Sequence, residues 1–403
     1  MLTTRRARAS RVIAARLAFL AIFALLGVSA CSSGQTATWH GPGGTDGGLK
    51  ITSPADGATD VPAGLTIAYA GNSSSAKVTL TTADGHVIDG ATGYDQNTWV
   101  PAKHLDYDTR YTAKVTSNDS SGQSRTATVS FRTMAEPNNL VRVQSALGDN
   151  LVYGIGMPII ITIGHGVSHE DHAEVQKRLT VQSSPEQQGS WYWMSDQEIH
   201  YRPKTFWSPG TQLHISVQTG GVPFGDGYYG RNDLTVDASI TPKPLQVRIN
   251  DKTHMLTVEQ DGKVVKTMPA SLGKRTTPSS SGAMVIMTRK PSELFDSSLG
   301  TGGIPVNSPG GYRLLVYYTM RLTWGGQFIH AAPWSVASQG HTDVSHGCTN
   351  ISTANAKWLY ENSHIGDPVT VANTPRKLAW GDGWTDWNVD WNTYVKGSAL
   401  PQR

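Results

Sequence analysis

Cysteine and charge are both scarce in this chain of 403 residues. Cys31 and Cys348 are its two cysteines, which excludes a fold built on a disulfide framework. Charged residues make up 16%, whereas glycine (42) and proline (21) are frequent, so turn-rich β architecture is favoured over a coiled coil or a mostly disordered chain. Five arginines and no acidic residue precede Cys31, so the net charge of +3 becomes −2 from Cys31 onward. Charge therefore gives no reason to expect nucleic-acid binding.

The N-terminal apolar stretch, Leu17–Val28, is shorter than the ~20 residues that a membrane-spanning helix needs. It follows basic residues and precedes small ones, so residues 1–30 have the layout of a secretory signal. Val28-Ser29-Ala30-Cys31 resembles the lipobox of bacterial lipoproteins, in which the cysteine becomes the lipidated first residue. We expect export and a lipid anchor at Cys31 on the outer face of the cell membrane. The alternatives are an ordinary cleaved signal or an uncleaved anchor.

The length predicts two or three domains of ~150 residues each, and the composition suggests where they divide. Residues 31–48, rich in serine, glycine and threonine, are expected to form a flexible tether. Residues 49–135 and 136–241 each contain short alternating segments separated by turn signals, which is typical of a small β-sandwich. Tyr111 is a candidate tyrosine-corner residue in the first of them.

A third unit, expected to be β-rich, covers residues 242–373. Alternating apolar residues over 245–249 predict a strand, and Asp261-Gly262 between two alternating segments predicts a hairpin. Ser352 or Thr353 can cap the only convincing helix, which fills residues 354–361.

The tail, residues 374–403, is rich in tryptophan. A spacing of 4-3-4 would place four of these side chains on one helical face, although nearby glycines weaken a helix. We expect the tail to pack against the third unit; the alternative is a surface that stacks on sugars. The four tryptophans are Trp380, Trp384, Trp387 and Trp391.

Cys348 is a lone thiol, which in an oxidising compartment is either buried and inert or used in chemistry. A nucleophilic thiol needs a base, and both His330 and His346 precede it. Gly347 lets the backbone pass close to a reacting carbonyl, and the predicted helix just beyond Cys348 would favour thiolate. These residues predict nucleophilic catalysis.

Two other interpretations of these residues are a buried structural thiol and a Cys/His metal site. A zinc site needs further ligands, and the chain contains no CxxC or HExxH spacing. The spacing of His169 and His172 does not fit a metalloprotease helix, and we expect a solvated turn there. We therefore expect neither a metal nor a cofactor.

The segment Ser345-His346-Gly347-Cys348-Thr349-Asn350, preceded by His330, resembles the signature H…[ST]HGCxN of the L,D-transpeptidase (YkuD) family. Residues 272–282, 304–313 and 339–341 match as well, and the resemblance runs from about 242 to 395. The arrangement upstream resembles the mycobacterial-type members, which have a lipobox and two immunoglobulin-like domains. The resemblance thus implies a mainly β protein with two immunoglobulin-like sandwiches before a YkuD-type catalytic domain and a Trp-rich tail.

The resemblance also implies residue roles. Cys348 would be the nucleophile, and His330 the general base and then acid, with His346 beside them. The amides of Gly347 and Cys348 would line the oxyanion hole. Substrate-binding positions would be Tyr312, Gly325, Gly326, Trp334, Ser345 and Asn350.

The implied reaction is cross-linking of peptidoglycan. In the family the thiolate attacks a tetrapeptide stem, D-Ala leaves, and a thioester forms. A side-chain amine of a second stem then attacks to give a 3→3 cross-link, and carbapenems acylate the same cysteine. L,D-carboxypeptidase activity, attachment of a protein to peptidoglycan and non-catalytic wall binding are the alternatives.

The chain departs from the family pattern at two places. Ala331 replaces a frequent serine, whose backbone carbonyl orients the base; because the contact is made by the backbone, we expect it to survive. The loop 295–303 contains Leu299-Gly-Thr-Gly-Gly303 where relatives often place an aromatic residue over the active site. This second departure affects the lid and substrate or inhibitor preference more than catalysis.

Overall fold

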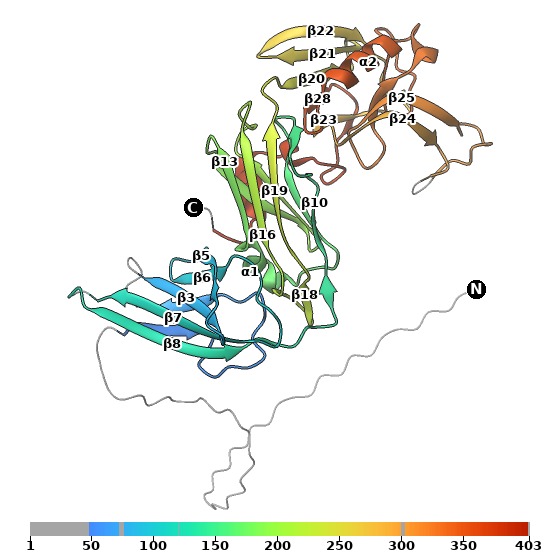
Figure 1. The fold of residues 1–403 in the computed structure, drawn as a ribbon. Helices are drawn as coiled ribbons and strands as arrows, with labels where there is room; N and C mark the ends of the chain where they lie inside the picture. Colours follow the sequence, from blue (N-terminus) through green and yellow to red (C-terminus); the bar gives the residue numbers. More distant parts are fainter. Residues whose placement is uncertain (1–47, 72–75, 120, 300–302, 402–403) are drawn as a thin grey trace, which may run out of the picture. The chain divides into compact units, whose positions relative to one another are not determined.

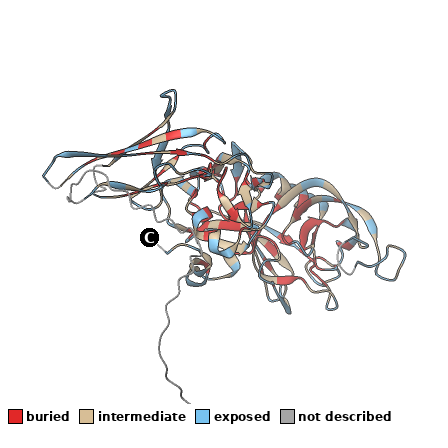
Figure 2. Cartoon of the chain, turned by 90° about the horizontal axis from the view of Figure 1, so that it is seen from below, coloured by how far each residue is buried: buried red, intermediate tan, exposed pale blue. Residues whose placement is uncertain are grey.

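The computed structural model describes residues 48–71, 76–119, 121–299 and 303–401, and most of its ordered elements are β-strands (Figure 1). The predicted signal, the lipobox with Cys31 and nearly all of the predicted tether lie outside the described residues. Within the described ranges, no helix has the length and apolar character needed to cross a membrane. Buried residues follow the inward faces of the strands, and exposed residues follow the edges and turns (Figure 2).

The first sandwich consists of two antiparallel sheets of four strands. One has the order β1 (Lys50–Ser53), β2 (Ile67–Ala70), β6 (Thr98–Pro101), β5 (Gly90–Thr92); the other has the order β4 (Val87–Ile88), β3 (Lys77–Thr82), β7 (Arg110–Asn118), β8 (Ser124–Arg132). Alternate residues of β7 face the core, as a half-buried strand requires. The Tyr111 hydroxyl accepts a hydrogen bond from the Asp106 amide at 3.1 Å, which is the contact expected of a tyrosine corner.

The second sandwich has two sheets and a small third sheet at one end. Their orders are β10 (Val143–Ser145), β12 (Ile159–Ile163), β15 (Glu198–Pro203), β14 (Gly189–Ser195); β11 (Leu151–Tyr153), β19 (Asp233–Ile240), β16 (Gln212–Gln218), β13 (Leu179–Ser184); and β17 (Pro223–Gly225), β18 (Tyr228–Gly230), β9 (Leu140–Val141). The expected solvated turn is instead the short helices η1 (His169–Asp171) and α1 (His172–Gln176). His172 is buried and stacks on Trp193 with ring centroids 3.8 Å apart, so that expectation is wrong.

The third unit contains two sheets around a separate apolar core. Their orders are β22 (Lys263–Pro269), β21 (Met255–Gln260), β20 (Leu245–Asn250), β28 (Pro368–Ala372), β23 (Ser280–Val285), β29 (Arg376–Lys377); and β24 (Thr288–Asp296), β25 (Arg313–Arg321), β26 (Phe328–Ala331), β27 (Thr349–Ile351). Three local predictions are confirmed: the strand over 245–249, the hairpin at Asp261-Gly262 and the helix α2 (Thr353–Asn362). The Ser352 hydroxyl caps α2 by accepting a hydrogen bond from the Asn355 amide.

The tail is not one helix, in keeping with the glycines that weaken a helix there. It contains η3 (Asp386–Asn388), α3 (Trp391–Tyr394) and η4 (Val395–Gly397). Gly381 and Gly383 adopt φ angles of +80° and +98°, which interrupt a helix before Trp384. The tryptophans therefore do not share one helical face.

The tail packs against the third unit, as expected, through β29 and Leu378, and it also packs against the second sandwich. Trp384 is buried in the sandwich core, and the Trp387 indole donates a hydrogen bond to the Gly156 carbonyl at 2.7 Å. The Arg202 guanidinium lies against the rings of Trp387, Trp391 and Tyr394. A contact with the third unit comes from the Asn388 side chain, which accepts a hydrogen bond from the Ala283 amide. The tail thus joins two units of the fold.

A buried ion pair reinforces this joint. His200 is fully buried, and its two ring nitrogens lie 2.9 Å from Asp386 and 2.8 Å from Glu198. Burial alone would lower the pKa of His200, but the two carboxylates outweigh burial and raise it to about 9. His200 is therefore a cation at neutral pH, compensated from both sides.

This ion pair predicts a loss of stability in mild alkali. The folded pKa of His200 lies above its value in the unfolded chain (~6.5), so its contribution is complete below about pH 6.5 and is lost as the pH rises through about 9. Thermal unfolding midpoints measured across this window should fall in the wild type and change less in Asp386→Asn, which should also be less stable at about pH 6.5. Parallel curves for the two proteins would contradict this assignment.

Candidate active site

The parallel pairing of β26 with β27 brings the two halves of the predicted site together. His330 on β26 lies opposite Asn350 on β27, and Cys348 directly precedes β27. His330 and Cys348 both line a cleft of about 500 Å³. The other residues that line it are Phe295, Tyr312, Leu314, Val316, Trp334, Ser335, Ser338, Val344, Ser345, His346 and Asn350.

The turn before Cys348 is closed by its own hydrogen bonds. The Ser345 hydroxyl donates to the Cys348 carbonyl at 2.6 Å and accepts from the Gly347 amide at 3.0 Å. The Ser279 hydroxyl donates to the Gly347 carbonyl at 2.7 Å. Gly347 has a φ of +130°, which a residue with a side chain rarely adopts. The Gly347 amide is thus bonded to Ser345 in this structure, and its role in an oxyanion hole stays a prediction.

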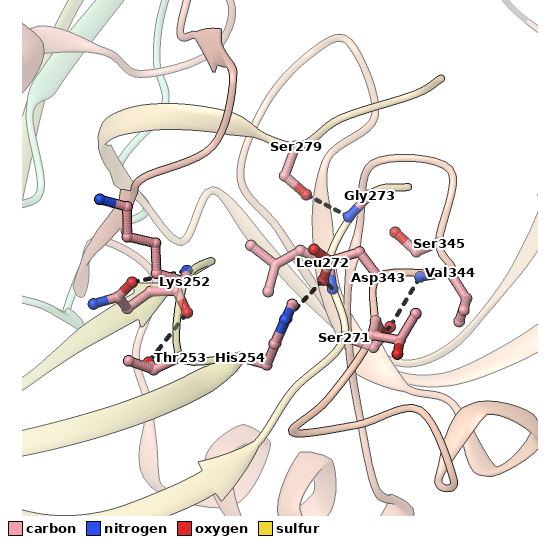
Figure 3. A network of polar contacts seen from close by, with 12 residues as sticks. Lys252, Thr253, His254, Ser271, Leu272, Gly273, Ser279, Asp343, Val344 and Ser345 are labelled. Atoms are coloured by element: carbon pink, nitrogen blue, oxygen red, sulfur yellow. Dashed lines mark hydrogen bonds and ion pairs between the residues drawn. The ribbon is translucent and has the colours of Figure 1, made fainter. Parts of the chain in front are cut away.

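A polar network behind this turn fixes its position (Figure 3). The Ser271 hydroxyl donates to the Thr342 carbonyl and accepts from the Val344 amide. The Asp343 carboxylate accepts from the Leu272 amide at 2.7 Å and lies 3.2 Å from the His254 ring nitrogen. Residues 342–345 are thereby attached to the segment that follows β22, so the nucleophile stands on a supported turn.

The Cys348 side chain is a neutral thiol in this structure. It donates a hydrogen bond to the Gly326 carbonyl at 3.5 Å. Burial raises the pKa of Cys348 to about 11, although the Phe328 amide and the charge of Arg321 lower it. The helix dipole expected to favour thiolate does not act directly, because strand β27 separates Cys348 from α2.

His330 is a neutral imidazole with a defined tautomer. Its Nδ1 lies 2.9 Å from the Ala331 carbonyl, so Nδ1 carries the proton and Nε2 is free to accept one. Burial lowers the pKa of His330 to about 4, although this hydrogen bond opposes the shift. The backbone contact expected to survive the replacement of serine by Ala331 is present.

His346 lies at the edge of the cleft. Its Nε2 is 3.2 Å from the Lys274 ammonium, and its ring centroid is 5.4 Å from that of Tyr312. Burial lowers the pKa of His346, and the positive charge of Lys274 lowers it further. The His346 Nε2 is occupied by Lys274, whereas the His330 Nε2 is free, so His330 is the better placed base.

Two aromatic rings lie close to His330. The Phe295 ring meets His330 edge-on at 5.4 Å, and the Trp334 ring lies 6.0 Å away. Phe295, near the end of β24 and at the start of the loop 295–303, supplies an aromatic residue at the site. Residues 300–302 of that loop lie outside the described residues.

The predicted substrate-binding residues divide into two groups. Tyr312, Trp334, Ser345 and Asn350 line the cleft. Gly326 contacts the nucleophile through its carbonyl. Gly325 is absent from the cleft lining, and its amide donates to Asp382 in the tail at 2.6 Å.

Several residues that matter to the geometry of the site were not predictable as site residues from the sequence. Ser335 lies within the matched segment that follows His330, and its hydroxyl accepts a hydrogen bond from the buried Asn350 amide. Ser279 and Phe295 act through contacts between distant segments, which no spacing reveals. Among the described residues, no three metal-ligating side chains form a group.

Two family models match the chain: a bacterial Ig domain over residues 58–223 and an L,D-transpeptidase catalytic domain over residues 244–371. L,D-transpeptidase 2 of Mycobacterium tuberculosis (strain CDC 1551 / Oshkosh) is 35% identical over 356 residues, covering 88% of this chain and 83% of that protein. The chain belongs to the L,D-transpeptidase family. L,D-transpeptidase 5 of Mycobacterium tuberculosis (strain ATCC 25618 / H37Rv) is 32% identical over 86% of this chain and 76% of that protein.

Solved structures agree with this membership. An L,D-transpeptidase in complex with imipenem is 31% identical, with a TM-score of 0.50, and the match covers 59% of this chain and 100% of that one. This L,D-transpeptidase is a cysteine-dependent acyltransferase.

The neutral thiol predicts a characteristic reactivity of the free enzyme. Because the pKa of Cys348 is about 11 and that of His330 about 4, neither group ionises between about pH 5 and about pH 9. The rate of Cys348 alkylation by iodoacetamide, followed by peptide mass, should rise steadily from about pH 7 to about pH 10. A plateau below about pH 8 would show a resting thiolate and contradict this account.

Proposed function

We propose that this enzyme forms 3→3 cross-links between peptidoglycan stems through a thioester on Cys348. The observation that carries the proposal is one cleft that contains both a neutral thiol and a neutral imidazole whose Nε2 is free to accept its proton. A tetrapeptide stem is the donor and a second stem is the acceptor. No cofactor takes part.

The proposed chemistry moves one proton through His330. The Cys348 sulfur attacks the carbonyl on the L-centre of the diamino acid while its proton passes to His330 Nε2. His330 returns the proton to the leaving nitrogen, and D-Ala departs, which leaves the thioester. A side-chain amine of the acceptor then attacks the thioester carbonyl, gives its proton to His330, and the thiol is restored.

Burial explains why this transfer favours a concerted route. A thiolate and an imidazolium would each be costly in the cleft before substrate arrives, since burial disfavours both charged forms. Negative charge therefore develops on the substrate's carbonyl oxygen only as that carbonyl is attacked, and backbone amide donors can stabilise the charge there. The Gly347 amide would join these donors if it left Ser345.

The cleft walls favour aminolysis over hydrolysis. Phe295, Leu314 and Val316 present apolar side chains around His330 and Cys348, and apolar walls hold water less well than polar walls do. The thioester is thereby given time to meet an amine. Transpeptidation is for this reason placed ahead of L,D-carboxypeptidase activity on the same site.

We further propose that carbapenems acylate Cys348. A solved relative is in complex with imipenem, and the match covers 59% of this chain. A β-lactam carbonyl can enter the same cleft and form the same kind of thioester. Trp334, which is 56% exposed at the cleft, would offer an aromatic surface to such a ligand.

The cellular location of the enzyme is likewise a proposal. The lipobox-like segment ending at Cys31 supports export and lipidation, which would attach the chain to the outer face of the cell membrane. The two sandwiches between the anchor and the catalytic unit would then carry the site into the cell wall.

Two substitutions test the assigned roles. Cys348→Ala should abolish cross-linking and leave the thermal unfolding midpoint close to that of the wild type. His330→Ala should lower the turnover of a tetrapeptide stem by ~10²–10⁴-fold, the usual contribution of general acid–base catalysis. Turnover is followed as cross-linked product by mass.

His346→Ala is the matched control, because His346 lies beside the same thiol and belongs to the same motif. Its loss should be smaller than that of His330→Ala. Residual cross-linking in Cys348→Ala would remove the nucleophile assignment. A loss of less than about tenfold in His330→Ala would transfer the base role to His346.

A further inference from the structure

The peptide group between Trp324 and Gly325, close to the nucleophile, is hydrogen-bonded to a cationic side chain at its carbonyl and to an anionic side chain at its amide. The Arg321 guanidinium donates to the Trp324 carbonyl at 2.9 Å. The amide of the same peptide group, on Gly325, donates to the Asp382 carboxylate at 2.6 Å. Hydrogen bonds to charged groups are roughly twice as strong as neutral ones, so this peptide plane is held unusually firmly for an exposed turn.

The turn that contains this peptide group carries the contact to the nucleophile. The carbonyl of Gly326, one residue beyond Gly325, accepts the hydrogen bond of the Cys348 thiol. Gly326 has a φ of +90°, and two successive glycines give a backbone many alternative conformations. Strand β26, which carries His330, begins two residues later. Movement of this turn would therefore disturb both nucleophile and base.

Arg321 is itself well placed by its surroundings. Its Nε donates to the Thr323 carbonyl at 2.9 Å, and its guanidinium carbon lies 5.1 Å from the centroid of the Phe328 ring. The same charge helps to lower the pKa of Cys348. Arg321 thus acts on the turn and on the thiol from one position.

Asp382 is brought to the turn by the tail. At the next residue, Gly383, an added Cβ would lie 2.8 Å from the Met287 sulfur and 2.9 Å from the Leu322 carbonyl, so the tail backbone lies directly against the residues that lead into the turn. Three residues further on, Asp386 is held by His200 of the second sandwich. Asp382 therefore reaches Gly325 from a segment that contacts both the third unit and the second sandwich.

We propose that Asp382 is a positioning residue for the transpeptidation reaction, which with Arg321 clamps the turn 323–326 and so places the Gly326 carbonyl against the Cys348 thiol. The inference rests on the proposed function in that Cys348 is the nucleophile. The clamp keeps the Cys348 thiol directed at the Gly326 carbonyl until His330 removes the thiol proton. A nucleophile displaced by even an ångström can lose about two orders of magnitude in rate, so a flexible two-glycine turn here needs such a restraint.

The test compares three variants of the full-length enzyme, purified in detergent. Asp382→Ala removes the acceptor, and Asp382→Asn removes the charge but keeps an acceptor oxygen. Asp390→Ala is the matched control, because Asp390 is another tail aspartate that accepts a backbone hydrogen bond, from the Thr393 amide at 3.0 Å, without contacting the turn. Each variant is assayed for turnover of a tetrapeptide stem and, separately, for alkylation of Cys348 by iodoacetamide.

Asp382→Ala should lower kcat by about tenfold and leave KM within about twofold, since the clamp orients the reacting groups rather than binding the stem. Asp382→Asn should recover most of this loss, and Asp390→Ala should keep the wild-type kcat. The alkylation rate of Cys348 should change in Asp382→Ala and stay the same in Asp390→Ala.

The proposal is overturned if Asp382→Ala keeps the wild-type kcat and alkylation rate, or if Asp390→Ala loses as much as Asp382→Ala does. If Asp382→Ala does not fold, Arg321→Lys replaces it, because lysine keeps the charge but cannot bond the Thr323 and Trp324 carbonyls as the guanidinium does. An unchanged kcat in Arg321→Lys would then overturn the clamp. If the wild type forms no cross-linked product, the proposed function fails, and the alkylation rates alone decide on the clamp.

Discussion

The parallel pairing of β26 with β27 is the constraint on which the active site depends. It brings together residues about twenty positions apart in the chain, and its register places His330 opposite Asn350. A shift of one residue would turn the side chains of β26 to the other face of the sheet and remove the base from the cleft. The Ser271–Asp343 network and the Ser279 hydrogen bond both serve to hold the turn that leads into β27.

The same burial that supports this geometry decides how the chemistry starts. His330 and Cys348 are both neutral in the resting enzyme, so reactivity depends on the arrival of a substrate carbonyl rather than on a standing thiolate. A neutral thiol reacts slowly with alkylating and oxidising agents. The Gly326 carbonyl stabilises the neutral thiol, because it accepts a hydrogen bond from the thiol and could accept none from a thiolate.

Local features of the fold were predictable from the sequence because short-range physical chemistry determines them. The capped helix α2 follows from Ser352 and the residues after it, and the β21–β22 hairpin follows from Asp261-Gly262. The family motif also identified His330 and Cys348, and the structure places both on one cleft.

Features that depend on distant segments were missed or wrongly predicted. The tryptophan spacing alone would place four indoles on one helical face. The positive φ angles of Gly381 and Gly383 interrupt such a helix, and the Trp387 indole is held by its hydrogen bond to the second sandwich. The expected helix dipole at Cys348 failed because three residues of strand intervene, a detail fixed by pairing with β26. The bond between Gly325 and Asp382 joins positions 57 apart, and no local pattern encodes it.

The most direct test of the central claim is product analysis after the full-length wild-type enzyme is incubated with a muropeptide that carries a tetrapeptide stem. We expect a cross-linked dimer that has lost one D-Ala, together with a transient acyl adduct on Cys348 in the intact-protein mass. A tripeptide monomer in place of the dimer would show hydrolysis and an L,D-carboxypeptidase. Folded protein with a reduced thiol that forms neither adduct nor product would contradict the account.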